Sequence, residues 1–259
     1  MPVLDALGRD PAVNCVTLVE PDEYKLHNVE RHLFPASAVG RLKVELAAEW
    51  LRERRPDVEV RTFACDLLDA KMQDDLAAAA ASCDIGVCAA DNEPAKFHFD
   101  ALMRRAGKPW TLGEVLSGGI GGFVHRFTPG GPCYGCVAGH LQRTVALDDD
   151  KAPDYSQPGG PIETTIPAGL AAIRAMAGLH AAVTLSMLNE PADDPGFTTL
   201  LIALRRVAGV FDEPFRPIRI RIARSADCLI CRDHPPAAGE SPEDLDVALD
   251  QAFARLGNV

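Results

Sequence analysis

Two Cys-x-x-Cys pairs stand far apart in this sequence and constrain its fold more than any other feature. They are Cys133-Tyr-Gly-Cys136 and Cys228-Leu-Ile-Cys231. The spacing within each pair lets both sulfurs face one ion, and two such pairs make a closed four-thiolate zinc site of the structural kind. The sequence therefore predicts a Zn²⁺ ion that ties the C-terminal part of the chain to its middle. Two redox dithiols, or four buried thiols, are the alternatives.

Composition limits the kinds of partner. The chain has 259 residues, of which 47% are hydrophobic, enough for one large domain with a buried core. Its formal net charge of -11 would repel a nucleic-acid backbone, so we expect no nucleic-acid partner. No stretch reaches the roughly 18–20 uncharged apolar residues of a membrane span. The first ten residues lack the basic region and apolar run of a signal peptide. We expect a cytoplasmic protein without a membrane segment.

The hydrophobic pattern alternates between strand and helix spacing through the first half of the chain. Buried-strand patterns cover 14–20, 58–63, 83–91, 109–115 and 121–128, and helical patterns cover 40–54, 71–81 and 93–106. This order predicts an α/β fold with a Rossmann-like, doubly wound and mostly parallel sheet. The strict alternation of Ile218–Ile222, which follows an apolar helix at 167–188, predicts an antiparallel portion near the C-terminus.

Two of the expected strands end in acidic residues, Glu20 and Asp91. In open parallel sheets, ligands bind at the carboxyl ends of the strands. These two positions are therefore where we expect the chemistry. We divide the chain into a domain over 1–234, with a long crossover loop at about 141–166, and a linker with a C-terminal helix over 235–259.

Five short motifs follow one another in a fixed order. They read TLVEPDEYKLHNVERHLF, VGRLKVELA, CAADN, PCYGC and CLIC. The order resembles that of the ThiF/MoeB/HesA family, which includes the activating enzymes of ubiquitin-like conjugation. That family shows an acidic strand end, Asn-x-x-Arg, Gly-x-x-Lys, a strand ending in Asp-Asn, and two Cys-x-x-Cys pairs. The resemblance runs from about Val13 to Cys231, most of the chain.

The resemblance implies a reaction that joins a carboxylate to the α-phosphate of ATP and releases pyrophosphate. Arg31 and Lys43 would contact the phosphates, for which a guanidinium fork and an ammonium charge are suited. Asp91 would hold Mg²⁺, which prefers oxygen ligands. These three are the implied catalytic residues. The implied nucleotide-binding set adds Glu20 at the ribose hydroxyls, Asp22 in the same turn, Asn28 near the phosphates, and Asn92.

The resemblance also implies a partner. Family members act on ubiquitin-like or sulfur-carrier proteins that end in a Gly-Gly tail, and they form homodimers. A homodimer and such a partner are therefore expected for this chain. Taken one at a time, each of these charged residues is more often a solvated surface charge or a turn residue, so the prediction depends on the ordered set.

The sequence departs from the family pattern in two places. The family begins with a strand and a Gly-x-Gly-x-x-Gly turn, whereas here Met1 falls inside the helix that should follow that turn. The glycine run Gly118–Gly122 precedes a strand, so it lacks the helix N-terminus that a phosphate loop needs. Relatives that pass the acyl group onward use a cysteine in the crossover loop. No cysteine lies between Cys136 and Cys228, and Glu163 stands near the expected position.

These departures leave three functional hypotheses. The first is ATP-dependent adenylation of a protein C-terminus without a thioester step. The second is a degenerate, non-catalytic binding module or a fragment of a longer activating enzyme. The third is a nicotinamide-dependent oxidoreductase, suggested by an acidic residue at a strand end, against which the missing dinucleotide turn and the cationic residues argue.

Overall fold

Two β-sheets form the framework of the computed structural model, which describes residues 1–141 and 167–232. The smaller sheet pairs β1 (Cys15–Val19) with β2 (Glu59–Phe63) in parallel. The larger sheet has five strands in the order β3-β4-β5-β6-β7. Their bounds are Gly86–Cys88, Trp110–Val115, Gly121–Phe127, Thr199–Ala203 and Pro217–Ile220.

The pairing of strands confirms an α/β fold with an antiparallel C-terminal portion. In the larger sheet β3 and β4 are parallel, whereas β4 with β5, β5 with β6, and β6 with β7 are antiparallel. Parallel pairing is therefore confined to β1–β2 and β3–β4. The antiparallel portion extends further toward the N-terminus than the strand at 217–220 alone.

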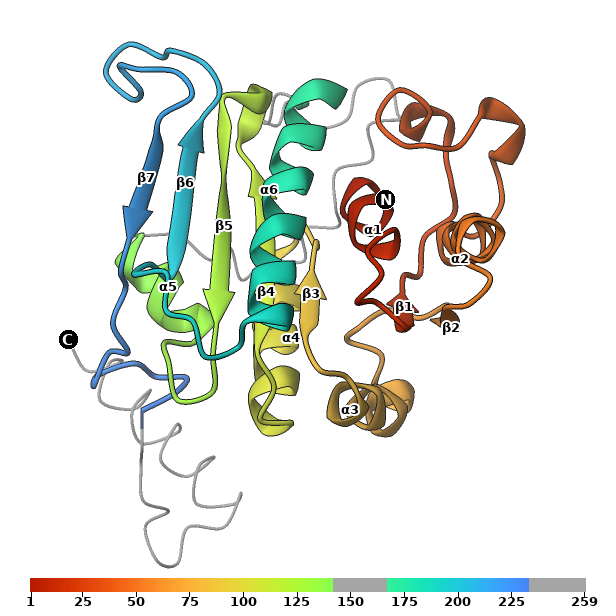
Figure 1. Cartoon of the computed structure of the whole chain (residues 1–259), viewed down its shortest axis with the longest axis horizontal. Helices are drawn as coiled ribbons and strands as arrows, with labels where there is room; N and C mark the ends of the chain where they lie inside the picture. Colours follow the sequence, from red (N-terminus) through yellow and green to blue (C-terminus); the bar gives the residue numbers. More distant parts are fainter. Residues whose placement is uncertain (142–166, 233–259) are drawn as a thin grey trace, which may run out of the picture.

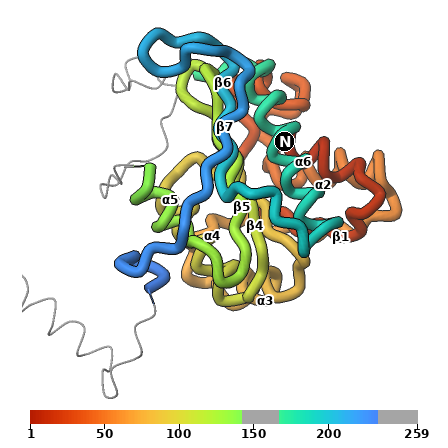
Figure 2. The backbone as a smooth tube through the Cα atoms, turned by 60° about the vertical axis from the view of Figure 1, so that its left-hand side comes forward, coloured from red at the N-terminus to blue at the C-terminus, as the bar shows by residue number. Residues whose placement is uncertain are grey.

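Helices cover both faces of the larger sheet (Figures 1 and 2). On one face α6 lies across β4 and β5 and contacts α1, while α4 and α5 lie on the other face. Residues 43–54 and 73–82 form α2 and α3, which pack beside the smaller sheet and against α4 respectively. The bounds are α1 Pro2–Gly8, α2 Lys43–Arg54, α3 Gln73–Ser82, α4 Glu93–Arg105, α5 Tyr134–His140 and α6 Leu170–Asn189.

Alternating side chains of β4 build the two faces of the sheet. Trp110 and Leu112 point into the main core, where the Trp110 ring stacks on Phe127 with centroids 3.9 Å apart. Gly113 lies on the opposite face beneath α6. A methyl group there would lie 2.4 Å from His180 Nδ1, so only glycine lets α6 approach this closely. The helix and sheet are thus in direct contact at Gly113.

Helix α6 is the one described helix that is long and apolar enough to cross a membrane by composition. It packs against β4, β5 and α1. The buried side chain of His180 shares a 2.9 Å hydrogen bond, between its Nε2 and Thr111 Oγ1 of β4, which further connects the helix to the sheet.

The two sheets are not joined by hydrogen bonds. Among the described residues, β1 pairs only with β2, and β3 pairs only with β4. Figure 1 shows no strand between β1 and β3. Each of these strands therefore keeps one edge without a neighbouring strand, at the place where the family resemblance predicts a further central strand.

Three elements differ from the pattern-based expectation. Strand β3 covers only Gly86–Cys88, because the chain turns away after Cys88 toward α4. Helix α5, which starts right after Cys133, and strand β6 were not predicted. Most of the expected crossover loop at 141–166, including Glu163, and the linker and helix at 235–259 lie outside the described residues.

Candidate nucleotide site and cysteine cluster

The turn after β1 brings three of the expected site residues together. Residues 22–24 run antiparallel to 40–43, with backbone bonds from Lys43 N to Asp22 O (2.9 Å) and from Tyr24 N to Arg41 O (2.7 Å). This pairing places Lys43, the first residue of α2, with its Nζ 2.6 Å from Asp22 Oδ2. Glu20 Oε1 accepts a 3.1 Å hydrogen bond from Asp22 N.

Burial gives Glu20 an unusual electrostatic setting. Desolvation raises the pKa of its carboxyl group, although the nearby Lys43 charge acts in the opposite direction. The side chain is half-buried at the end of a strand, with its other carboxylate oxygen available for a further donor. A carboxylate in this position can accept hydrogen bonds from a diol, the role that the family resemblance assigns to it.

The stretch from 26 to 34 holds the two remaining residues of this half of the site. Asn28 is buried, and its Oδ1 accepts a 2.9 Å hydrogen bond from Lys25 N while its own N–H donates to Lys25 O. Its side-chain oxygen thus stabilises the local turn. Tyr24 O–H donates 2.6 Å to Phe34 O and fixes the end of the stretch in the core around α2.

Arg31 opens onto a cavity of about 340 Å³. The other walls of this cavity are His27, Glu30 and residues 167–170 at the start of α6. The first turn of α6 carries backbone N–H groups without intrahelical partners, which favours an anion near this end. Arg31 therefore lies where a negatively charged ligand has both a cation and a helix N-terminus beside it.

His32 lies near several positive charges. Burial lowers the pKa of its imidazole from 6.5 to about 4, and the positive charges of the N-terminus, Lys43 and Arg31 act in the same direction. Lys43 and Arg31 come from different elements but influence the same histidine. The structure thus brings the two expected phosphate-binding cations into one neighbourhood.

Asp91 and Asn92 lie in the turn between β3 and α4, and both are exposed. Asn92 Oδ1 accepts a 2.8 Å hydrogen bond from Ala95 N and caps α4. Within residues 1–141 and 167–232, no hydrogen bond or ion pair joins Asp91 to Arg31 or Lys43. The carboxylate of Asp91 is open to solvent, as a metal ligand requires.

A set of buried polar residues next to this turn was not expected from the sequence. Lys96 of α4 lies 2.7 Å from both Glu93 Oε1 and Glu114 Oε1, and Glu114 Oε2 lies 2.9 Å from His125 Nε2. One sequence signal pointed to it. Glu114 places a carboxylate in a strand whose first three residues are buried, and carboxylates near a core are rare unless they are paired.

The four expected zinc ligands converge. The Sγ atoms of Cys133 and Cys136 are 3.8 Å apart, those of Cys133 and Cys228 are 3.5 Å apart, and those of Cys136 and Cys231 are 3.4 Å apart. All four sulfurs lie within 4.8 Å of one another. A tetrahedral ion with Zn–S bonds of about 2.3 Å needs sulfurs about 3.8 Å apart. The cluster therefore fits one zinc ion.

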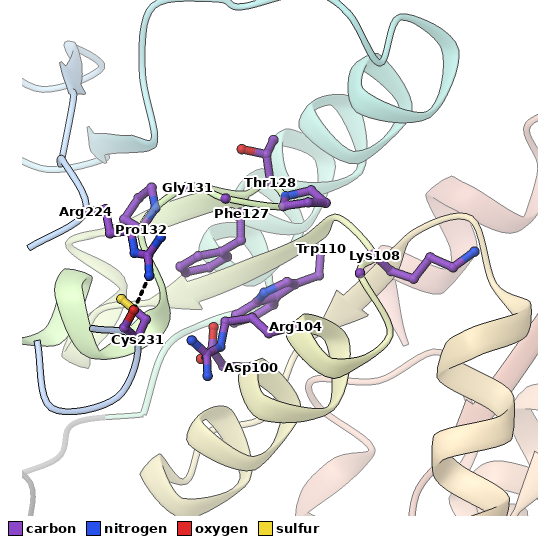
Figure 3. Close-up of a pocket in the computed structure, with 13 residues that line it drawn as sticks. Asp100, Arg104, Lys108, Trp110, Phe127, Thr128, Gly131, Pro132, Arg224 and Cys231 are labelled. Carbon is purple, nitrogen blue, oxygen red and sulfur yellow. Dashed lines mark hydrogen bonds and ion pairs between the residues drawn. The ribbon is translucent and has the colours of Figure 1, made fainter. Parts of the chain in front are cut away.

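Two arginines support the second cysteine pair from outside. Arg104 Nη2 donates 3.3 Å to Ile230 O, and Arg224 donates to Cys231 O. Figure 3 shows Arg224 reaching Cys231 and Arg104 beside Asp100, around a cavity of about 210 Å³. This cavity lies at the Trp110 end of β4. It is therefore at the opposite end of the sheet from the turn that carries Asp91.

The glycine run has a structural explanation. Gly118 and Gly119 have positive φ angles of 69° and 66°, and a methyl group on Gly119 would lie 2.8 Å from Ala172 Cβ of α6. The run makes a tight turn against α6 and leads into β5, as expected from its place before a strand. It does not lead into a helix.

Comparison with known proteins agrees with this geometry. The model of the ThiF family matches residues 12–216. The chain is similar to E. coli MccB solved with ATP, with a TM-score of 0.59 at 17% identity over 89% of this chain and 69% of that chain. It is similar to the microcin C7 biosynthetic enzyme MccB in complex with N-formylated MccA, with a TM-score of 0.61 at 18% identity over 89% and 70%.

A third similar structure is that of PaaA, with a TM-score of 0.55 at 13% identity over 85% of this chain and 75% of that chain. No curated protein sequence matches significantly. At these identities the likeness concerns the fold. The roles of individual residues are argued from their positions in this chain.

Proposed function

Because this chain belongs to the ThiF family, we propose that it is an adenylyltransferase that activates the C-terminal carboxylate of a peptide or protein with ATP. The observation that carries the proposal is the placement of two cations near the end of β1. Lys43 pairs with Asp22 in the turn after that strand, Arg31 lines a cavity with the start of α6, and Glu20 follows the strand. Anionic phosphates and a ribose diol match these groups in chemistry.

The reaction needs charge stabilisation more than acid–base catalysis. A carboxylate oxygen of the substrate bonds to the α-phosphorus of ATP, the bond from that phosphorus to the bridging oxygen breaks, and pyrophosphate leaves with the electron pair. Two anions approach one another, so cations placed at the phosphates lower the barrier. We assign this task to Arg31 and Lys43.

Lys43 must exchange partners for this role. Its Nζ contacts Asp22 Oδ2 at 2.6 Å, and the Asp22 side chain is 61% exposed. An exposed carboxylate is a weak competitor for a polyphosphate, because surface ion pairs contribute only about 0–1 kcal/mol. We propose that Lys43 turns from Asp22 to the phosphates, and that Asn28 holds the turn that presents Arg31.

Asp91 would hold the Mg²⁺ that accompanies ATP, since its exposed carboxylate follows a parallel strand at the edge where ligands bind in such sheets. Asn92 contributes by capping α4 and fixing the turn. Bound Mg²⁺ offsets the negative charge of the phosphates. Glu20 would accept hydrogen bonds from the ribose.

The domain that performs this chemistry extends over 1–234, and we propose that it needs one more strand. The unpaired edges of β1 and β3 support the idea that a strand followed by a glycine-rich turn pairs between them. Such a turn would supply backbone N–H groups to the phosphates. Without it, we expect the affinity of this chain for ATP to be weak.

The reaction would end at the acyl-adenylate. No cysteine lies between Cys136 and Cys228, and the Cys133–Cys231 cluster is engaged by its own four thiols. The usual thioester cysteine is therefore lacking. The adenylate would then pass to a nucleophile other than a cysteine of this chain, as in the family's sulfur-carrier branch.

For the substrate, we propose a ubiquitin-like or sulfur-carrier protein with a C-terminal Gly-Gly tail. The cavity beside Arg31 adjoins the Gly118–Gly119 turn through the start of α6, where a small-residue tail can approach the backbone closely. We further propose that the protein acts in the cytoplasm as a homodimer. These finer assignments follow from the family resemblance.

A second candidate function is a binding module that holds such a partner without chemistry. The open edges of β1 and β3, and the engagement of Lys43 by Asp22, favour it. The two functions differ in whether the cations at the end of β1 bind nucleotide.

Equilibrium binding of ATP to the whole chain distinguishes them, with Lys43→Met as the test variant and Arg41→Met as the matched control. Arg41 is an exposed cation two residues away that pairs with Glu49. The adenylyltransferase proposal predicts weak ATP binding that Lys43→Met abolishes and Arg41→Met preserves. Equal binding by all three proteins, or none by the parent chain, would favour the binding module.

A further inference from the structure

A buried ion-pair network anchors the start of α4 to β4, directly after the turn that carries Asp91. Lys96 Nζ lies 2.7 Å from Glu93 Oε1 and 2.7 Å from Glu114 Oε1. The Lys96 side chain is only 6% exposed. A buried ammonium group is costly unless it is paired and hydrogen-bonded, so these contacts determine where the first turn of α4 sits.

Both oxygens of Glu114 are held. While Oε1 accepts from Lys96, Oε2 lies 2.9 Å from His125 Nε2, and His125 Nδ1 lies 2.8 Å from Thr199 Oγ1. His125 and Thr199 are fully buried on β5 and β6. Contacts with β5 and β6 therefore hold the Glu114 side chain in place on β4. The ion pair with Glu114 in turn positions Lys96 relative to these three strands.

The helix end of the network is held in the same way. Glu93, the first residue of α4, accepts a 2.7 Å hydrogen bond from Tyr134 O–H through its second carboxylate oxygen. Tyr134 is fully buried, and its backbone N–H donates 3.0 Å to Asp100 further along α4. The first turn of α4 thus cannot rotate without breaking contacts at both Lys96 and Glu93.

Asp91 lies between two anchors to the same strand. Cys88, the last residue of β3, is buried and pairs in register with Leu112 of β4. Lys96 reaches Glu114, two residues further along β4. The segment between Cys88 and Lys96 is short, and Asn92 capping tightens it further. These contacts limit where the backbone of Asp91 can lie relative to the sheet.

We infer that Lys96 and Glu114 are positioning residues that hold Asp91 for the Mg²⁺ that accompanies ATP, an inference that rests on the proposed function. They act through the backbone of the turn and touch neither metal nor nucleotide. Loss of an outer group that hydrogen-bonds a metal ligand lowers metal affinity about 10-fold to 100-fold, and loss of support through the backbone should act in the same direction. A purely structural ion pair would change stability and leave metal dependence as it was.

Binding of a non-hydrolysable ATP analogue at increasing Mg²⁺ concentration separates these roles, with no catalytic turnover needed. Lys96→Met should raise the Mg²⁺ concentration for half-maximal enhancement about 10-fold or more, while Mg²⁺-free binding stays as in the parent chain. Lys96→Arg, which keeps the charge, should restore most of the enhancement. Arg105→Met is the matched control, because Arg105 is an exposed cation in the last turn of the same helix.

Each outcome of this binding experiment either supports or overturns the positioning role of Lys96 and Glu114. A Lys96→Met protein that folds and keeps the parent's Mg²⁺ dependence would overturn the inference and leave the proposed function intact. A parent chain without Mg²⁺-enhanced binding would overturn both. Where Lys96→Met does not fold, Glu114→Gln keeps the side-chain shape and removes the charge. The same rise in the required Mg²⁺ is expected from it, and an unchanged requirement would again overturn the inference.

Discussion

Removing the second cysteine pair should cost this domain a large part of its stability. The ion would join 133–136 to 228–231, with Cys133 and Cys228 separated by 95 residues, as are Cys136 and Cys231. In the chain-entropy model, a cross-link that closes a loop of this length stabilises the fold by about 4.7 kcal/mol. Folded domains are stable by only about 5–15 kcal/mol, so the loss would be conspicuous.

The assay is equilibrium urea unfolding of the parent chain and of a Cys228→Ser/Cys231→Ser variant, each with equimolar zinc and with a chelator. The matched control is Cys65→Ser, a half-buried cysteine outside the cluster. We expect one zinc ion per parent chain, a chelator effect in the parent and the control, and none in the double variant.

Two results would contradict a structural zinc site in this chain. One is a purified chain that holds no zinc and whose unfolding does not respond to added zinc. The other is a double variant as stable as the zinc-loaded parent, which would mean that the four sulfurs are only neighbours in the core. A loss much smaller than about 4.7 kcal/mol would show that the segment around Cys228 unfolds separately from the domain.

Two further predictions concern stability. Gly113→Ala should destabilise the fold by about 1–3 kcal/mol, because the added methyl group would overpack against His180. Gly178→Ala on α6 should stabilise the fold by about 1 kcal/mol, because its methyl group meets open space. Thermal unfolding of both variants tests this contrast, and equal effects would contradict the close packing at Gly113. His32 is half-buried and His180 is buried, and this loss of solvent lowers the pKa of each from 6.5 to about 4. The unfolded chain therefore binds protons more readily than the folded chain. The contribution of these histidines to the free energy of unfolding should be complete above pH 6.5 and should be lost as the pH falls toward 4. His32→Gln should flatten this fall in urea titrations, and an unchanged slope would contradict it.

The sequence was sufficient to predict the features whose patterns are local in the chain. Helix α2 begins at Lys43, within the predicted helical stretch, and the predicted cysteines converge across 95 residues. Both patterns are local in the chain: a helical repeat in one case and a Cys-x-x-Cys spacing in the other. The family resemblance indicated that these motifs belong to one fold, because they follow one another in the family's order.

Other features depend on contacts that no local pattern records. Helix α5 is short and contains Gly135 and Gly139, so its composition does not favour a helix, yet it follows Cys133 directly. Strand β6 is a short apolar run that could equally belong to a buried helix segment. Their structures follow from the cluster and from pairing with β5.

The candidate site divides in the same way. The sequence motifs indicated Arg31, Lys43 and Asp91, whereas the Lys96–Glu114 pair joins residues 18 apart on different elements. The ion pair of Lys43 with Asp22 likewise joins residues 21 apart in the sequence. Motifs in the sequence can indicate candidate ligand-binding residues, whereas the residues that hold them in position are recognised only from the three-dimensional structure.

If this chain adenylates a carboxylate, it should catalyse ATP–pyrophosphate exchange. Exchange is measured on the zinc-loaded chain with and without a protein that ends in Gly-Gly, beside an Asp91→Asn variant that keeps the shape of the turn. We expect slow, Mg²⁺-dependent exchange that requires the carboxyl-terminal substrate and disappears in Asp91→Asn. A folded, ATP-binding chain with no exchange, or exchange that persists in Asp91→Asn, would contradict it.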